Sequence, residues 1–303
     1  MWGVFNVIVA LMLYIDLAVG QKKSHAVSMK EAALWSLVWV AVSLLFGVGI
    51  YFYLSPEKAM QFLTGYLIEK SLSVDNMFVF IMIFSYFSVA PEHQPRVLKW
   101  GILGALVMRF ILIFVGAALI QRFHWVLYVF GGFLLYTAYQ MAFGGEKEFK
   151  PEENPLFRLV KKWLPMTGLR GDRFFARVDG ALHATPLFLA LLVVEFSDLV
   201  FALDSIPAIF SITQDTFLVY TSNVFAILGL RALYFLVSGL VQLFAYLKFG
   251  VALILAFVGV KMLASHVVHI STGLSLGVVM GVLVLSIVAS VFWPPRKAAP
   301  AAS

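Results

Sequence analysis

The chain has 303 residues, of which 62% are hydrophobic and only 13% are charged, against roughly 25% charged in soluble domains. Its mean hydropathy is +0.94, so the composition excludes an ordinary water-soluble protein and indicates a polytopic membrane protein. The sequence contains no cysteine, which excludes disulfides, thiolate metal sites and thiol redox motifs.

Nine apolar windows are long enough to form membrane-spanning helices, which need about 20 residues each. They cover residues 2–20, 31–54, 62–88, 98–120, 125–143, 185–211, 217–241, 248–265 and 271–293. Continuous apolar runs exclude a membrane β-barrel, whose strands alternate in polarity. We predict an all-α, single transmembrane domain over residues 1–303. The first window is expected to stay as a helix, because no basic residue precedes it as in a signal peptide.

Lysine and arginine residues are distributed unevenly on the two sides of these windows, and this asymmetry sets membrane orientation. One side carries only Lys58 and Arg122. The other side carries Lys22, Lys23, Lys30, Arg96, Lys99, Lys147, Lys150, Arg158, Lys161, Lys162, Arg170, Arg173, Arg177, Lys248, Arg296 and Lys297. The amino terminus is therefore expected outside and the carboxyl terminus in the cytoplasm. Topology accounts for the net charge of +6, so no nucleic-acid partner is expected.

The third and sixth windows resemble each other, which indicates an internal repeat. Glu69 and Asp75 are six residues apart, as are Asp198 and Asp204, and SVDNMFVF then aligns with ALDSIPAIF. In the following window of each unit, GILGALVMR and NVFAILGLR both end in an arginine. These matches predict that helices three to five are repeated as helices six to eight.

The predicted repeat units are residues 62–143 and 184–265. An odd number of helices per unit inverts the second copy, an arrangement common in secondary transporters, whose substrate sites lie near the midplane between the repeats. The polar residues 144–183 between the units are expected in the cytoplasm. There, PLFRLVKKWLP is typical of an interfacial helix, and RFFARV and ALHAT flank Asp-Gly as in a two-residue hairpin. A structural or a regulatory role of this segment stays open.

Five acidic residues fall inside windows that lipid should surround, although a charge at the bilayer centre costs a few kcal/mol at least. They are Glu69, Asp75, Glu195, Asp198 and Asp204. They must therefore face one another, an aqueous cavity or an ion. The rise along two antiparallel helices pairs Glu69 with Asp204 and Asp75 with Asp198, in layers about 9 Å apart. Pro207 lacks an N–H and is expected to make its helix irregular, freeing the Leu203 carbonyl as an oxygen ligand.

Only hard oxygen ligands are available in these windows. The predicted metal ligands are Glu69, Asp75, Asn76, Glu195, Asp198 and Asp204, with Ser205 as a further neutral oxygen. The histidines lie in loops or at helix ends, at positions 25, 93, 124, 183, 266 and 269. Oxygen ligands favour Mg²⁺, Ca²⁺ or Mn²⁺ over Cu²⁺ and Zn²⁺.

Buried ion pairing is the structural alternative to an ion site. With Asp16, six acidic residues face four basic ones, which are Lys70, Arg109, Arg231 and Lys261. The excess of two negative charges suits one divalent cation, although protonation of a buried acid would also remove charge. Arg109 and Arg231 are expected to be counter-ions that hold the acids in place. Asp16 either supports that network or belongs to the ion path.

Three segments resemble the signature regions of the TerC family of bacterial integral membrane proteins: EKSLSVDNMFVF, VEFSDLVFALDSIPAIF and TSNVFAILGLRALYFLV. The resemblance covers nearly the whole chain, including HAVSMKEAALWSLVWV and ATPLFLALLVVEFSD. It implies a multi-pass protein of the bacterial inner membrane, associated with alkaline pH, that exports manganese. It also implies that the five buried acids conduct the metal. Family names record tellurium resistance and redox modulation, which this sequence does not explain physically.

The leading hypothesis is therefore a secondary transporter that exports Mn²⁺, with inward protons taken by the same carboxylates. Mutual repulsion favours protonation of metal-free acids, and metal binding requires their deprotonation. A membrane enzyme is not expected, since the sequence contains no HExxH, no GxSxG and no phosphate-cradling glycine loop. No cofactor is expected, and the partners are a divalent ion and the lipid bilayer. The alternatives are a scaffold that delivers metal to unidentified proteins, and a pH- or redox-stress protein without its own flux.

Overall fold

The computed structural model describes residues 2–19, 28–123, 125–143, 173–178, 181–239, 246–264 and 270–292. Almost all of these residues are helical, in agreement with the predicted class. The elements are α1 (Trp2–Val19), α2 (Met29–Tyr53), α3 (Pro56–Tyr86), α4 (Gln94–Arg122), α5 (Val126–Phe143), β1 (Phe175–Val178), β2 (Ala181–Ala184), α7 (Pro186–Phe210), α8 (Thr216–Ile227), α9 (Leu230–Gly239), α10 (Leu247–Leu263) and α11 (Thr272–Phe292).

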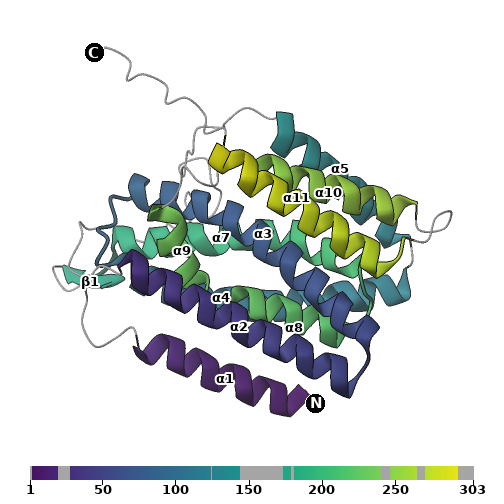
Figure 1. The fold of residues 1–303 in the computed structure, drawn as a ribbon. Helices are drawn as coiled ribbons and strands as arrows, with labels where there is room; N and C mark the ends of the chain where they lie inside the picture. The colour runs from purple at the N-terminus through teal and green to yellow at the C-terminus, as the bar shows by residue number, and fades with distance from the viewer. Residues whose placement is uncertain are drawn as a thin grey trace.

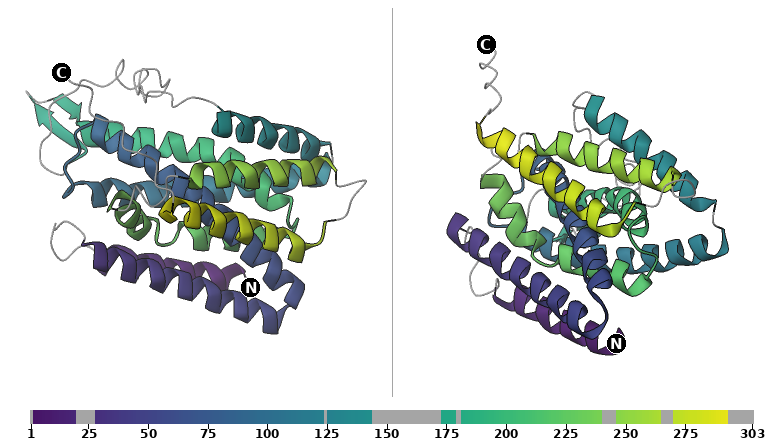
Figure 2. Two further views of the ribbon diagram at one scale, coloured as in Figure 1. Left: turned by 45° about the horizontal axis from the view of Figure 1, so that its top comes forward. Right: turned by 45° about the vertical axis from the view of Figure 1, so that its right-hand side comes forward.

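Helix α3 lies at the centre of the bundle and packs against α2, α7, α8, α9, α10 and α11 (Figure 1). Its start is well defined, because Ser55 accepts a hydrogen bond from the Lys58 backbone N–H and Pro56 occupies the first turn. Helix α1 lies along the outside of the bundle beside α2, and α5, α10 and α11 form the opposite side (Figure 2). The charged residues of α3 are thereby placed among other helices.

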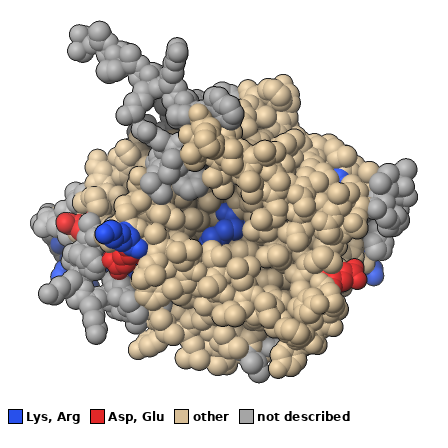
Figure 3. All heavy atoms as spheres, in the orientation of Figure 1, with Lys and Arg blue, Asp and Glu red and all other residues tan. Residues whose placement is uncertain are grey.

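The outer surface suits a lipid environment. Charged residues gather at the two ends of the face seen in Figure 3, and its middle is almost free of them apart from one basic spot. Within the described ranges, five helices are long and apolar enough to cross a membrane, namely α2, α4, α5, α7 and α11, and the bent pair α8 and α9 makes six. Helices α1 and α10 contain shorter apolar stretches. The protein is a polytopic helical membrane protein, and nine spans stay a prediction.

The predicted single helix over residues 217–241 is wrong, because the structure breaks it into α8 and α9, bent by 48°. Leu228 leaves the helical conformation with ψ at 128°. Gly229 follows with φ at +81°, a conformation that only glycine adopts without strain. By contrast, α7 continues through Pro207 for three more residues. The irregular backbone predicted at Pro207 is therefore not observed, because a proline in the last turn disturbs few helical hydrogen bonds. The irregular backbone is found instead between α8 and α9.

The packing of helices has a reciprocal pattern. Helix α3 packs against α8, and α4 packs against α7, while α5 packs against α10. In the predicted repeat, α3 corresponds to α7, α4 to α8 and α9, and α5 to α10. The contact of α3 with α8 then corresponds to the contact of α7 with α4, and the contact of α5 with α10 corresponds to itself. This pattern is the one that a two-fold repeat of residues 62–143 and 184–265 would produce. The repeat and its exact limits stay a prediction.

The hairpin predicted after the polar segment is confirmed. Strands β1 and β2 pair antiparallel, from Phe175 opposite Ala184 to Val178 opposite Ala181. Arg96, in the first turn of α4, lies over the ring of Phe174 at 5.3 Å and joins the hairpin to the bundle. The interfacial helix predicted in PLFRLVKKWLP lies outside the described residues, as do most of residues 144–183.

Candidate functional site

Four polar side chains from four helices meet in the interior of the bundle. They are Glu69 of α3, Arg109 of α4, Asp198 of α7 and Asn223 of α8, and each is at most 3% exposed. Two of these helices belong to each predicted repeat unit. Because an unpaired charge in such a place is very costly, these groups must satisfy one another.

The guanidinium of Arg109 is the centre of this network. Its Nε donates to Asp198 Oδ2 at 3.2 Å and its Nη2 donates to Asp198 Oδ1 at 2.9 Å. Its Nη1 donates to Glu69 Oε1 and, at 3.3 Å, to Asn223 Oδ1. The Asn223 amide donates in turn to Glu69 Oε2 at 3.1 Å. All four carboxylate oxygens of the two acids therefore accept an N–H, and the network keeps one negative charge in excess.

Close packing of α4 on α7 brings Arg109 to Asp198. A Cβ added at Gly101 would lie 3.2 Å from the Val194 side chain, and one added at Gly104 would lie 2.1 Å from Glu195 Oε1. Small residues allow helix backbones to approach in this way in membranes. The Glu195 carboxylate consequently rests against the backbone of α4.

The remaining acids of α7 lie in different surroundings. Glu195 is half-buried, feels the like charge of Asp198, and has no hydrogen bond or ion pair among the described residues. Asp204 is also half-buried, and its Oδ1 accepts a hydrogen bond from Thr137 Oγ1 of α5 at 3.0 Å. Beside it, the Ser205 hydroxyl is buried without a hydrogen-bond partner in the described part of the chain.

The other predicted site residues are not among the four side chains of this network. Asp16 and Asp75 belong to α1 and α3, but their side chains lie outside the described structure. Asn76 is buried. Arg231 is half-buried in the first turn of α9. Within the described residues, no three acid or histidine side chains are close enough together to hold a metal ion.

The predicted carboxylate layers are wrong for the described acids. Glu69 and Asp198 were expected at different depths, yet both bind the guanidinium of Arg109. One guanidinium can bind both acids only if Glu69 and Asp198 lie at about the same level, where antiparallel α3 and α7 pack against each other. In antiparallel helices that meet there, Asp75 and Asp204 extend about 9 Å in opposite directions from that level.

Two lysines also end inside the bundle. Lys70 Nζ donates to the Ala226 carbonyl at 3.2 Å, next to the break between α8 and α9. Lys261 Nζ donates to Ser275 Oγ at 2.9 Å. Neither forms an ion pair with an acid of the described chain, so the pairing of these lysines with the buried carboxylates is not observed.

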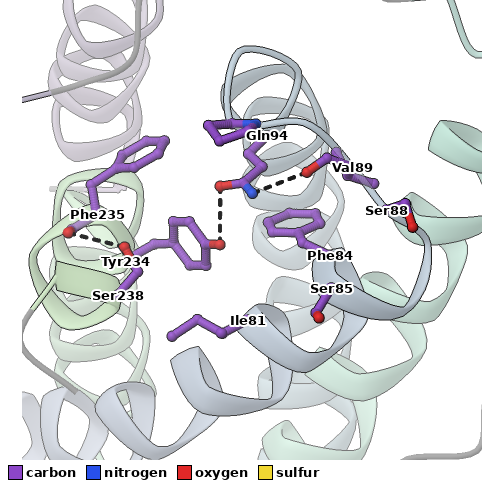
Figure 4. Close-up of a pocket in the computed structure, with 10 residues that line it drawn as sticks. Ile81, Phe84, Ser85, Ser88, Val89, Gln94, Tyr234, Phe235 and Ser238 are labelled. Atoms are coloured by element: carbon purple, nitrogen blue, oxygen red, sulfur yellow. Dashed lines mark hydrogen bonds between the residues drawn. The ribbon is translucent and has the colours of Figure 1, made fainter. Parts of the chain in front are cut away.

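A cavity of about 420 Å³ opens at the end of the bundle near the hairpin. It lies between the end of α3, the start of α4 and α9, and its lining carries only neutral groups (Figure 4). Tyr234 Oη donates to Gln94 Oε1 at 3.1 Å, and Gln94 Nε2 donates to the Val89 carbonyl at 3.2 Å. The cavity offers hydroxyl and amide oxygens but no carboxylate, so it is not the predicted acidic site.

Comparison with known families identifies the family of this chain. The model of the integral membrane protein TerC family matches residues 54–298. The protein belongs to the TerC family. Proteins named "Putative membrane-bound redox modulator Alx" are 53% identical in Salmonella typhi, over 95% of this chain and 92% of the relative, and 52% identical in Escherichia coli K12, over 95% and 93%. An uncharacterized membrane protein of Myxococcus xanthus is 50% identical over 96% and 91%. No solved structure matches the chain.

Asn223 and Thr137 are the polar partners that the sequence analysis of this TerC family member missed. Asn223 is the first residue of the motif NVFAILGLR, whose arginine gives the match to the other repeat unit. A buried amide in an otherwise apolar span is itself a signal of a polar contact. Thr137 carries no comparable signal, because threonine is frequent in membrane helices and bonds its own backbone.

Proposed function

We propose that the protein is a secondary transporter that exports Mn²⁺ from the cytoplasm through its buried carboxylates, in exchange for protons. The observation that carries this proposal is the pair of acids, Glu69 and Asp198, held in the interior by one arginine contributed from a third helix. Intramembrane acids are costly and mark ion or proton paths. The residues work by binding and release, and no covalent reaction is proposed.

The acids of α7 supply a route. From the expected topology, α7 runs from the cytoplasmic side outward, so Glu195, Asp198 and Asp204 follow one another over about 13 Å of helix rise. Glu195 accepts no described hydrogen bond and, of these three acids, would lie nearest the cytoplasmic side. Asp204 and the Ser205 hydroxyl, which has no partner among the described residues, offer oxygens nearer the outer side. Asp75 and Asn76 of α3 are proposed as further ligands.

The chemistry of the ligands supports the proposed ion class. Carboxylate, amide and hydroxyl oxygens suit Mn²⁺, Mg²⁺ and Ca²⁺, and the resemblance of the sequence motifs to a manganese-exporting family favours Mn²⁺. Proton exchange follows from the same groups, because an acid that releases a metal ion in a buried site gains by taking a proton.

Flux through purified protein in liposomes tests the proposal. Mn²⁺, Ca²⁺ and Mg²⁺ are each loaded on one side, with and without a pH gradient, and empty liposomes serve as the control. We expect Mn²⁺ movement that a pH gradient accelerates. Absence of flux for all three ions, from protein that is folded and inserted, would overturn the proposal.

The name of the relatives supports a second candidate, a membrane protein that affects redox balance without its own flux. The present chain contains no cysteine, so such an effect could not use dithiol exchange by its own residues. A scaffold that delivers metal to partner proteins is a related alternative. Recovery of a stable protein complex together with the lack of liposome flux would favour the scaffold.

A further inference from the structure

The guanidinium of Arg109 occupies the position that a metal ion would need. Every carboxylate oxygen of Glu69 and Asp198 already accepts an N–H from Arg109 or Asn223. Each of these oxygens has a second lone pair, but a cation placed between the two acids would lie against the positive guanidinium, and like charges repel strongly in the interior. A divalent ion bound between these two acids therefore has to displace the guanidinium.

A displaced guanidinium needs another anion, because a free charge in the interior is very costly. Glu195 is the acid placed to receive it. It lies one turn before Asp198 on α7, and its carboxylate rests against Gly104 of α4. Side chains on a helix lean toward the amino terminus, so the side chain of Arg109 points toward the level of Gly104. The guanidinium would move by about one helical turn, roughly 4.5 Å for three residues.

The charges balance for a divalent ion. When ionised, Glu69, Asp198 and Glu195 together with Arg109 carry a net charge of minus two. One divalent cation neutralises this set, whereas a monovalent cation leaves one buried negative charge. Glu195 has no described hydrogen bond or ion pair before the ion arrives, so accepting the guanidinium breaks no other described contact.

We propose that Arg109 is a tethered cation that holds Glu69 and Asp198 in the metal-free protein and moves to Glu195 when a divalent ion binds between them. This inference rests on the proposed transport function and adds the exchange step at its site. Arg109 is thus a competitor of the transported ion, and Glu195 is the acid that receives Arg109 and does not ligate the metal.

Mn²⁺ binding to purified full-length protein in lipid nanodiscs tests the exchange. Binding is measured by calorimetry and by the loss of the free Mn²⁺ paramagnetic resonance signal. Removing a competitor that fills the site nine times out of ten raises the affinity about tenfold, so Arg109→Gln should bind Mn²⁺ at least about tenfold more tightly than the wild type. Arg122→Gln removes a charge from the exposed end of the same helix and should bind as the wild type does. A lower affinity of Arg109→Gln would show that the arginine only organises the site, and would overturn the exchange.

A double-mutant cycle assigns the role of Glu195 and does not depend on one variant. Glu195→Gln alone should weaken Mn²⁺ binding at least about fivefold, within the usual range of coupling between sites, because the guanidinium loses its second anion. In the Arg109→Gln background the same change should alter affinity less than twofold. An equal loss in both backgrounds would make Glu195 a direct metal ligand and overturn the proposal. If Arg109→Gln does not fold, an unchanged affinity of Glu195→Gln alone would overturn it.

The outcomes separate this inference from the transport proposal. Wild-type protein that neither binds nor moves Mn²⁺ contradicts the proposed function. Wild-type protein that binds and moves Mn²⁺, with variants that fail the expected order, contradicts only the exchange between Arg109 and Glu195.

Discussion

Arg109 and Asp198 form a bidentate ion pair, in which Arg109 Nε donates to Asp198 Oδ2 at 3.2 Å and Arg109 Nη2 donates to Asp198 Oδ1 at 2.9 Å. Both side chains are at most 5% exposed. Two parallel bonds fix the orientation as well as the distance of the partners, so α4 and α7 are held in one rotational register. The third nitrogen of the guanidinium is thereby aimed at Glu69 of α3.

Removing the positive charge of this pair should destabilise the fold. Arg109→Leu leaves two buried carboxylates without compensation, and breaking a buried pair typically costs about 3–5 kcal/mol. Arg109→Lys keeps the charge, but an ammonium cannot form the bidentate hydrogen bonds of a guanidinium. The loss of about two hydrogen bonds should cost about 2 kcal/mol. Equilibrium unfolding in mixed micelles measures both values. Equal stability of the leucine variant and the wild type would contradict the importance of the pair.

Asp215 combines a helix cap with an ion pair, and two substitutions separate them. Its Oδ1 accepts from the Phe217 backbone N–H at 3.1 Å, and its Oδ2 lies 2.8 Å from Lys58 Nζ. Asp215→Ala should cost about 1–2 kcal/mol, mostly the cap. Asp215→Asn keeps a capping oxygen and loses a partly exposed ion pair, so it should cost about 0–1 kcal/mol. The same unfolding assay at two salt concentrations checks this, and a larger loss for Asn than for Ala would refute the assignment.

The break between α8 and α9 should depend on Gly229. A Cβ there would lie 2.5 Å from Trp39 Cδ1, and the backbone has a φ of +81°. Gly229→Ala should therefore cost about 1–3 kcal/mol in strain alone, with the overlap adding to it. Gly132→Ala is the matched control, since nothing lies within 4 Å of its added methyl, and it should be neutral or slightly stabilising. Thermal unfolding of both variants decides, and a neutral Gly229→Ala would contradict the described break.

Isosteric amides test which buried acids serve transport. Asp75→Asn and Asp204→Asn remove charge with little change in volume, and we expect both to abolish Mn²⁺ flux in liposomes and protection of cells from excess manganese. Asp16→Asn should do less harm, because Asp16 lies outside the repeated pair of segments. If both variants retain flux, the carboxylates are structural and the proposed mechanism is wrong.

The predicted orientation places residues 144–183 in the cytoplasm. Cysteines introduced at Lys161 and Lys162 should react with a membrane-impermeant maleimide only after cells are opened. The native sequence contains no cysteine, so no background labelling of the protein is expected. Labelling in intact cells would reverse the topology and the proposed direction of the acids along α7.

The sequence predicted where helices occur better than how they meet. Most window limits fall within a few residues of the helix ends, since lipid forces backbone groups to pair within a helix. The neighbours of Arg109 were not predictable in the same way, because they come from three other helices. Hydropathy does not determine the order of these helices around the bundle. Glu69 and Asp198 were expected at different depths for this reason.

The break between α8 and α9 was not predicted, although the sequence contains a glycine, Gly229, at this position. The stretch ILGLR is apolar on both sides of the glycine, and a lone glycine is tolerated inside many membrane helices. In the fold, Trp39 of α2 fills the space beside Gly229, so a residue with a Cβ does not fit there. Such a long-range contact cannot be inferred from the local pattern.

The central network also limits relative motion of the two halves of the bundle. Four hydrogen bonds of Arg109 and Asn223 join α3 and α4 to α7 and α8. Each bond to a charged group typically contributes about 1.5–3 kcal/mol, so sliding one half against the other is costly while the bonds are intact. The centre of the bundle is therefore expected to behave as one rigid body, and slow amide hydrogen exchange should be concentrated in the facing segments of these four helices.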